Sequence, residues 1–267
     1  MNLSVTGPRV FLELPWNMPD STIFTMKNII TQTTVSLVVV SLFLVILSLI
    51  VTKNLKKKRP GGLQIVAEKL VNMLYGLVED TMGKHNMKFA PYIGTLFLSS
   101  IIGSLIGMTQ IFRSVTADLS VTAAWALVTM GMVWYNNIKN FGFGTWLKGF
   151  TEPIPVMTPM NIISEIATPL SMAFRHFGNV AGGSMLTALI YAALGAASQL
   201  IFGWLPGLLG EIPFFQAGIP AFLSLYFDLF SGFVQALVFS LLTMIYVGGA
   251  CPPPSELPEK KRKAKEG

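Results

Sequence analysis

The sequence contains few charged residues: Asp, Glu, Lys and Arg make up 12% of its 267 residues, against roughly a quarter in soluble globular domains. This scarcity excludes a disordered chain and argues against an ordinary cytosolic enzyme. The single cysteine, Cys251, excludes an internal disulfide framework. The sequence also lacks a phosphate loop, an HExxH motif and a CxxC pair, so we expect no catalytic site, metal or cofactor.

Hydrophobic residues, in contrast, make up 52% of the chain and gather in five long runs. A helix needs about 20 apolar residues to cross a bilayer core, and each run has about this length or more. The runs cover residues 29–51, 90–112, 119–138, 162–201 and 219–249. We therefore expect an all-α membrane protein with five transmembrane helices, which form one domain over residues 29–249.

Basic residues predict the orientation, because cytoplasmic loops of membrane proteins are rich in lysine and arginine. The first run is followed by a basic cluster, and a second cluster lies near the C-terminus. We therefore expect residues 1–28 outside and residues 250–267 as a mobile basic cytoplasmic tail. This distribution explains the net charge of +6 without a nucleic-acid partner. The N-terminus lacks an Arg- and Ser-rich transit segment, which favours a bacterial plasma membrane.

Residues 63–82 form an amphipathic segment between the first two runs. Its apolar residues recur at spacings of three to five, which predicts a helix. We expect this helix to lie flat in the cytoplasmic membrane interface. The alternative is a loop helix that packs on its neighbours. The apolar stripe consists of Leu63, Val66, Leu70, Met73, Leu77 and Met82.

One arginine, Arg175, lies inside the fourth run. Placing arginine at mid-bilayer costs at least about 2.5 kcal/mol, so such a residue usually has a function or a buried partner. Snorkelling to an interface is difficult, because the run continues for more than a dozen residues on either side. Ser171, Gly178, Asn179 and Gly182 share its helical face. Gly178 and Gly182 form a pair that lets another helix approach closely, and plain helix packing is the alternative reading.

Further polar residues lie in the last two runs. Asp228 and Gln235 are seven residues apart, so they share a helical face and suggest a wet cavity or a relay. Asp228 alternatively meets solvent at the outer helix end, and Gln235 has Arg175 or a partner protein as candidate partners. Glu165 is expected to line an inner aqueous access or, alternatively, to lie at the interface. His176 points about 100° away from Arg175 and is expected to be a neutral histidine facing the bundle or lipid.

Three stretches resemble one known family. Residues 169–182 resemble the RLFGN signature of subunit a of F-type ATP synthases, through Leu170, Ser171, Arg175 and the segments 177–179 and 181–182. Residues 235–239 and 242–246 resemble the last helix of that family, and residues 116–122 resemble its TADLN loop. The order and spacing of these stretches cover the chain from about residue 25 to 248.

The resemblance implies a non-catalytic stator that couples proton flow, or alternatively sodium flow, to ATP synthesis. It would lie beside a rotating ring of c subunits, each with a carboxylate, and contact the peripheral-stalk subunit b and lipid. Arg175 would keep the passing carboxylate ionised and separate two half-channels, with Asn179 and Gln235 beside it. The last two long helices would face the ring, and Ser171, Gly178 and Gly182 would contact it.

The chain departs from the family pattern at several positions. His176 stands where leucine is usual, and Ser184 stands where many members have glutamate or histidine. Asp228 occupies the frequent partner position seven residues before Gln235. The usual acid–imidazole relay is therefore incomplete, and we expect Asp228 to act alone with water on the outer route, with Ser184 kept among the ion-translocation residues. Two other hypotheses remain: a stand-alone secondary transporter, although no inverted repeat is found, and a membrane assembly scaffold with a structural arginine.

Overall fold

The computed structural model describes residues 10–13, 29–53, 55, 61–109, 112–202 and 226–256. This part of the chain is helical, apart from a short ribbon in which β1 (Val10–Glu13) pairs antiparallel with β2 (Ile29–Thr31). The α-helices are α1 (Gln32–Thr52), α2 (Gly62–Met82), α3 (Ala90–Leu105), α4 (Leu119–Phe141), α5 (Phe143–Gly149), α6 (Thr158–Phe202) and α9 (Gly232–Gly249). Short 3-10 turns are η1 (Lys84–Phe89), η2 (Ile106–Thr109), η3 (Val115–Ala117), η4 (Pro155–Met157) and η7 (Pro254–Glu256), and η6 (Tyr226–Ser231) is a π-helical turn.

Four helical stretches in the described residues are long and apolar enough to cross a membrane: Gln32–Thr52, Lys84–Leu105, Pro155–Ile201 and Leu229–Gly249. A multi-pass helical membrane protein is thereby confirmed. The predicted third span, residues 119–138, forms α4 but is not among these four. Asn136, Asn137 and other polar residues reduce its hydropathy, so the count of five spans stays a prediction.

Several predicted boundaries differ from the observed ones: residues 29–31 of the first run form β2, and α6 begins at Thr158 rather than at residue 162. The second run was expected to be helical to residue 112, but α3 ends at Leu105 and a 3-10 turn continues to Thr109. The fifth run was expected to begin at residue 219, but residues 219–225 lie outside the described residues. The described part of that run begins with the π turn at Tyr226. Such turns are rare, so the periodicity of the sequence does not predict them.

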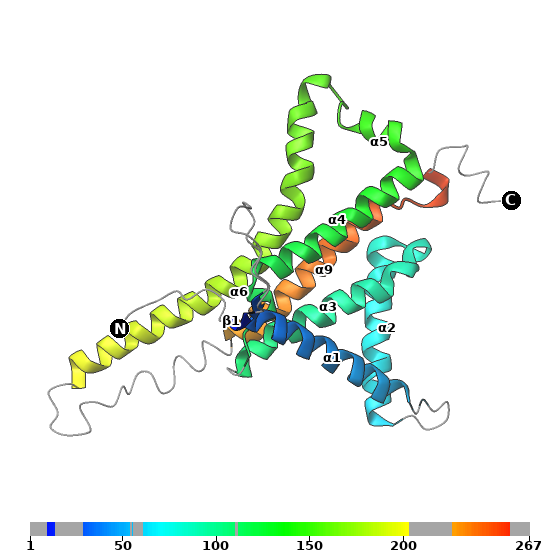
Figure 1. Cartoon of the computed structure of the whole chain (residues 1–267). Helices are drawn as coiled ribbons and strands as arrows, with labels where there is room; N and C mark the ends of the chain where they lie inside the picture. The colour runs from blue at the N-terminus through cyan, green and yellow to red at the C-terminus, as the bar shows by residue number, and fades with distance from the viewer. Residues whose placement is uncertain are drawn as a thin grey trace.

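The helices pack around a core formed mainly by α3, α4 and α9. Figure 1 shows α4 and α9 running side by side, and α3 contacts α9 along its length. Next to them, α1 packs on α3, and α2 packs on α3 and α9. Buried apolar side chains fill the contacts, among them Val78, Met82, Ile93, Met130, Met244 and Val247.

The predicted amphipathic helix is present as α2, but the face that packs coincides with the predicted stripe only at its C-terminal end, at Leu77 and Met82. Leu74, Val78 and Met82 are buried, whereas Leu63 and Met73 are exposed. The C-terminal half of α2 therefore packs on its neighbours, as in the alternative reading, because the helix is apolar on more than one face. The interfacial position of its N-terminal half stays a prediction.

The predicted tail begins later than residue 250. Ala250 and Cys251 are buried, with 2% and 3% of their surface exposed. Asn140 Nδ2 donates to the Ala250 carbonyl and Asn86 Nδ2 to that of Cys251, both at 2.8 Å. These bonds hold the end of α9 to the bundle. Residues 257–267 lie outside the described residues.

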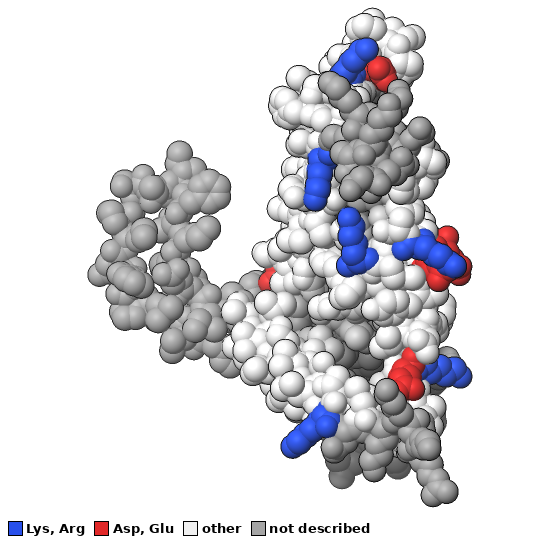
Figure 2. Space-filling model, turned by 90° about the vertical axis from the view of Figure 1, so that its right-hand side faces the viewer, with Lys and Arg blue, Asp and Glu red and all other residues white. Residues whose placement is uncertain are grey.

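Figure 2 views the side of the molecule on the right of Figure 1, where α2 and the end of α9 lie. Lysine and arginine side chains are spread over this face among uncharged residues and a few acidic side chains. One ion pair is present there within the described ranges, between Lys84 Nζ and Glu79 Oε1 at 3.3 Å. The positive-inside pattern predicts this side to face the cytoplasm.

Helix α6 is too long for a single perpendicular crossing. Its 45 residues extend about 68 Å at a rise of about 1.5 Å per residue, more than twice a bilayer core of about 30 Å. The helix contains Pro169, which cannot donate a backbone bond to the Glu165 carbonyl and is typical of kinks. Figure 1 shows α6 changing direction along its length. Both features let a helix of this length lie obliquely in a membrane.

Candidate functional site

Arg175 lies well inside α6 on a face that no other described helix covers. Its side chain is exposed, while Met172, Ala173 and His176 on the opposite face are buried. Among the described residues, none forms an ion pair or hydrogen bond with the guanidinium group. The cation is therefore available to a group outside the described part of this chain.

Small residues continue the Arg175 face in both directions along α6. Ser171, Gly178 and Gly182 are all exposed, as their predicted position on this face requires. A Cβ atom added at Gly178 or Gly182 would meet nothing within 4 Å. We call Ser171, Arg175, Gly178 and Gly182 the open strip. Its small side chains permit the close approach of another helix.

His176 fixes the rotation of α6. Its side chain is fully buried, with Nε2 3.2 Å from Ser100 Oγ on α3. The rings of Trp125 and Phe239 pack against it in T-shaped arrangements, at centroid distances of 6.1 and 5.3 Å. His176 was predicted to face either the bundle or lipid. The structure confirms that it faces the bundle, so the lipid-facing alternative is wrong. Since successive helical residues differ by about 100°, this anchor turns Arg175 away from the bundle.

Asn179 and Gln235 join α6 to α9. Asn179 Nδ2 donates a hydrogen bond of 2.5 Å to Gln235 Oε1, and Gln235 is 3% exposed. The close packing of α6 on α9 thus brings Asn179 to this oxygen, a partner that was not predicted, and a bond from Gln235 to Arg175 or to a partner protein stays a prediction. Gln235 Nε2 is buried and has no hydrogen-bond partner in the described part of the chain.

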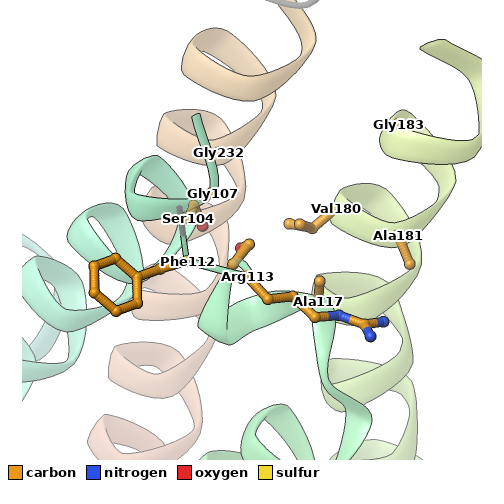
Figure 3. A pocket seen from close by; sticks show the side chains of 10 residues that line it. Ser104, Gly107, Phe112, Arg113, Ala117, Val180, Ala181, Gly183 and Gly232 are labelled. Carbon is orange, nitrogen blue, oxygen red and sulfur yellow. The ribbon is translucent and has the colours of Figure 1, made fainter. Parts of the chain in front are cut away.

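A pocket of about 350 Å³ lies beyond Arg175, between α3, the loop before α4, α6 and the start of α9. Figure 3 shows the Arg113 side chain extending from the loop toward α6 near Ala181. The sequence alone assigned no role to Arg113, and the only signal for it is its position just before the Thr116–Asp118 segment. The lining residues are Ser104, Gly107, Phe112, Arg113, Ser114, Ala117, Val180, Ala181, Gly183 and Gly232. We call this the outer pocket, after the predicted orientation.

The predicted outer-route residues Ser184 and Asp228 adjoin this pocket along the chain. Gly183, which lines the pocket, precedes Ser184, and Gly232 follows Asp228 by four residues. The side chains of Ser184 and Asp228 lie outside what the structure describes. The α-helical spacing expected between Asp228 and Gln235 does not hold, because the π turn Tyr226–Ser231 changes the number of residues per turn.

A second pocket, of about 330 Å³, lies on the other side of Arg175 between α4, α5 and α6. We call it the inner pocket. Ser164 and Glu165 line it together with Asn137 and Asn161. Trp134 Nε1 donates a hydrogen bond of 2.5 Å to Glu165 Oε1. No sequence signal marked Trp134, because an aromatic residue in an apolar run normally indicates packing.

The two pockets lie on either side of Arg175 along α6. Glu165 precedes Arg175 by ten residues, or about 15 Å along the axis, and Val180 follows it by five, or about 8 Å. The exposed cation is thus placed between two separate cavities, each lined by both polar and apolar residues. This arrangement defines a class: a multi-pass membrane protein with an exposed positive charge between two cavities.

Comparison with known proteins identifies the family within this class. The chain matches the family described as ATP synthase A chain over residues 33–248 and belongs to it. It is 32% identical over 271 aligned positions to the sodium-ion-specific ATP synthase subunit a of Propionigenium modestum, covering 92% of this chain and 86% of that protein. It is 34% identical to ATP synthase subunit a 1 of Crocosphaera subtropica, covering 78% and 81%, and 29% identical to ATP synthase subunit a of Legionella pneumophila, covering 82% and 86%.

Family membership confirms the predicted resemblance. The chain is a membrane subunit of an ATP synthase complex that serves ion transport and ATP synthesis, and it is not the catalytic subunit. Family membership favours the hypothesis of an ATP synthase subunit over the two alternatives, a stand-alone transporter and an assembly scaffold.

Proposed function

We propose that this chain is the ion-translocating stator of the ATP synthase membrane sector and that Arg175 faces the carboxylates of a rotating c ring. The observation that carries this proposal is the open strip, where an exposed cation without a described counter-charge lies beside two glycines with free space above them. A cation favours the ionised form of a nearby carboxyl group. Each ring carboxylate would therefore release its ion before it passes Arg175.

The two pockets support two half-channels. The outer pocket, with Asp228 and Ser184 beside it, provides the outer route, and the inner pocket, with Ser164 and Glu165, provides the inner route. Arg175 separates them, so an ion crosses only by travelling on the ring. The membrane potential can drive this passage, since about 2.3 kcal/mol per charge is available per 100 mV. The bond between Asn179 and Gln235 keeps α6 and α9 together beside Arg175.

The proposed setting follows from this role. The c ring contacts the open strip, subunit b of the peripheral stalk contacts other faces, and lipid covers the remaining apolar surface. The N-terminus lies outside and the C-terminus in the cytoplasm of a bacterial plasma membrane.

The proton is the proposed coupling ion, and sodium is the second candidate. The relative from Propionigenium modestum is named sodium ion specific, and it aligns with 92% of this chain. The purified complex in lipid vesicles distinguishes the two. A proton gradient imposed without sodium should drive ATP synthesis that a protonophore abolishes. ATP synthesis that requires a sodium gradient instead would establish the second candidate. If neither gradient drives ATP synthesis by a complex that still hydrolyses ATP, the proposed function is contradicted.

A further inference from the structure

The hydrogen bond between Trp134 and Glu165 is the only polar contact of the Glu165 carboxylate among the described residues. Trp134 Nε1 donates to Oε1, and no hydrogen bond to Oε2 is present in the described ranges. Since a carboxylate offers about four lone-pair positions, most of its acceptor capacity remains free. The carboxylate is half-buried and lines the inner pocket.

Trp134 is well suited to fix the position of this carboxylate. Its ring packs against the central core cluster of the bundle, so the donor itself is held in place. The indole nitrogen only donates hydrogen bonds, and bonds to charged acceptors are stronger than neutral ones. A glutamate side chain without such a bond keeps considerable rotamer freedom. The bond therefore selects one orientation of a side chain that otherwise samples several.

The alternative role for this hydrogen bond is only to stabilise the packing of α4 on α6, and this role explains the bond less well. These helices already pack closely on each other, and small apolar residues such as Ala126 and Ala173 are buried where they meet. The bond instead lies at the rim of a polar cavity that Asn137, Asn161 and Ser164 also line. These neighbours offer oxygen atoms to a proton carrier such as water or to a hydrated cation.

We propose that Trp134 is a positioning residue of the inner half-channel, which holds the Glu165 carboxylate so that its free oxygen receives the coupling ion. This inference rests on the proposed function and adds one pair of residues to its inner route. During ATP-driven pumping, ions enter from the cytoplasmic side, so Glu165 meets them before the ring does. Loss of the bond therefore weakens capture of the ion without blocking the ring.

The test is ATP-driven pumping by the whole complex in inverted membrane vesicles, measured over a range of coupling-ion concentrations (pH for protons, sodium concentration for sodium). Trp134→Phe keeps the ring and removes the N–H donor. We expect the ion concentration at half-maximal rate to rise about tenfold, with the maximal rate within about twofold of the original. Glu165→Gln should cause at least the same rise.

The double variant separates positioning from structure. If Trp134 acts through Glu165, Trp134→Phe should add nothing in the Glu165→Gln background. Tyr135→Phe is the control, because it also keeps the ring and removes one hydrogen-bond donor on α4, and the Tyr135 side chain is 63% exposed. It should leave the half-maximal concentration unchanged. Additive shifts in the double variant, or a Trp134→Phe variant that loses only abundance or maximal rate, would overturn the inference.

Arg175→Ala, measured in parallel, separates this inference from the proposed function. Normal pumping by Arg175→Ala would overturn the proposed function itself. Loss of pumping in Arg175→Ala, together with an unchanged ion dependence in Trp134→Phe, would overturn only the role of Trp134.

Discussion

Replacing Arg175 by alanine should lower ion-driven ATP synthesis at least about 100-fold, with normal amounts of the chain in the membrane. Removing one partner of a buried ion pair typically costs about 3–5 kcal/mol, which corresponds to a factor of about 10² or more, and every ring carboxylate passes this position. The chain itself should be unaffected, because no described residue depends on the guanidinium group. The measurement is ATP synthesis in vesicles after an imposed ion gradient, with immunodetection of the chain.

Lys148→Ala is the matched control, since Lys148 is an exposed cation on α5, away from the open strip. It should retain near-normal synthesis. If Arg175→Ala instead removes the chain from the membrane, Arg175 has a structural role and the scaffold hypothesis gains support. Normal synthesis by this variant would contradict the stator account.

Replacing Gly178 or Gly182 by leucine should lower ATP synthesis at least about tenfold and leave the chain alone intact. Neither position has a described neighbour within 4 Å of an added Cβ, so leucine is tolerated within the subunit. A ring helix that approaches the open strip would instead meet the new side chain, and overpacking typically costs about 1–3 kcal/mol. The measurement combines chain abundance, c-ring co-purification and ATP synthesis.

Gly131→Leu provides the comparison, because Gly131 on α4 is also exposed with open space above it. We expect this variant to behave almost like the original chain. Equal loss of synthesis at Gly131 and Gly178 would mean that bulk anywhere on the surface is harmful, and the open strip would then have no special role.

Sequence periodicity predicted the elements whose geometry is regular. The first run was predicted over residues 29–51 and forms α1 at Gln32–Thr52, because a continuous apolar stretch leaves no other structure in a bilayer. The face of α6 was also predicted: a rotation of about 100° per residue places Ser171 and Gly178 beside Arg175, and all three are exposed.

Features that depend on tertiary contacts or on irregular helix geometry could not be predicted in this way. The π turn Tyr226–Ser231 carries no periodic signal and shifts the register before Gln235. The bond from Trp134 to Glu165 joins residues 31 positions apart, and only the packing of α4 on α6 brings them together. The direction of the Arg113 side chain, which extends toward α6, likewise depends on the fold of the loop between η2 and α4.

Cysteine cross-linking tests most directly whether the open strip faces the ring. Buried Cys251 is first replaced by alanine, and Ser171→Cys is then combined with a cysteine on the outer ring helix beside its carboxylate. The account predicts a disulfide between the two subunits on mild oxidation, and none when Gly131→Cys replaces Ser171→Cys. Cross-linking from Gly131→Cys but not from Ser171→Cys would place the ring on another face and contradict the account.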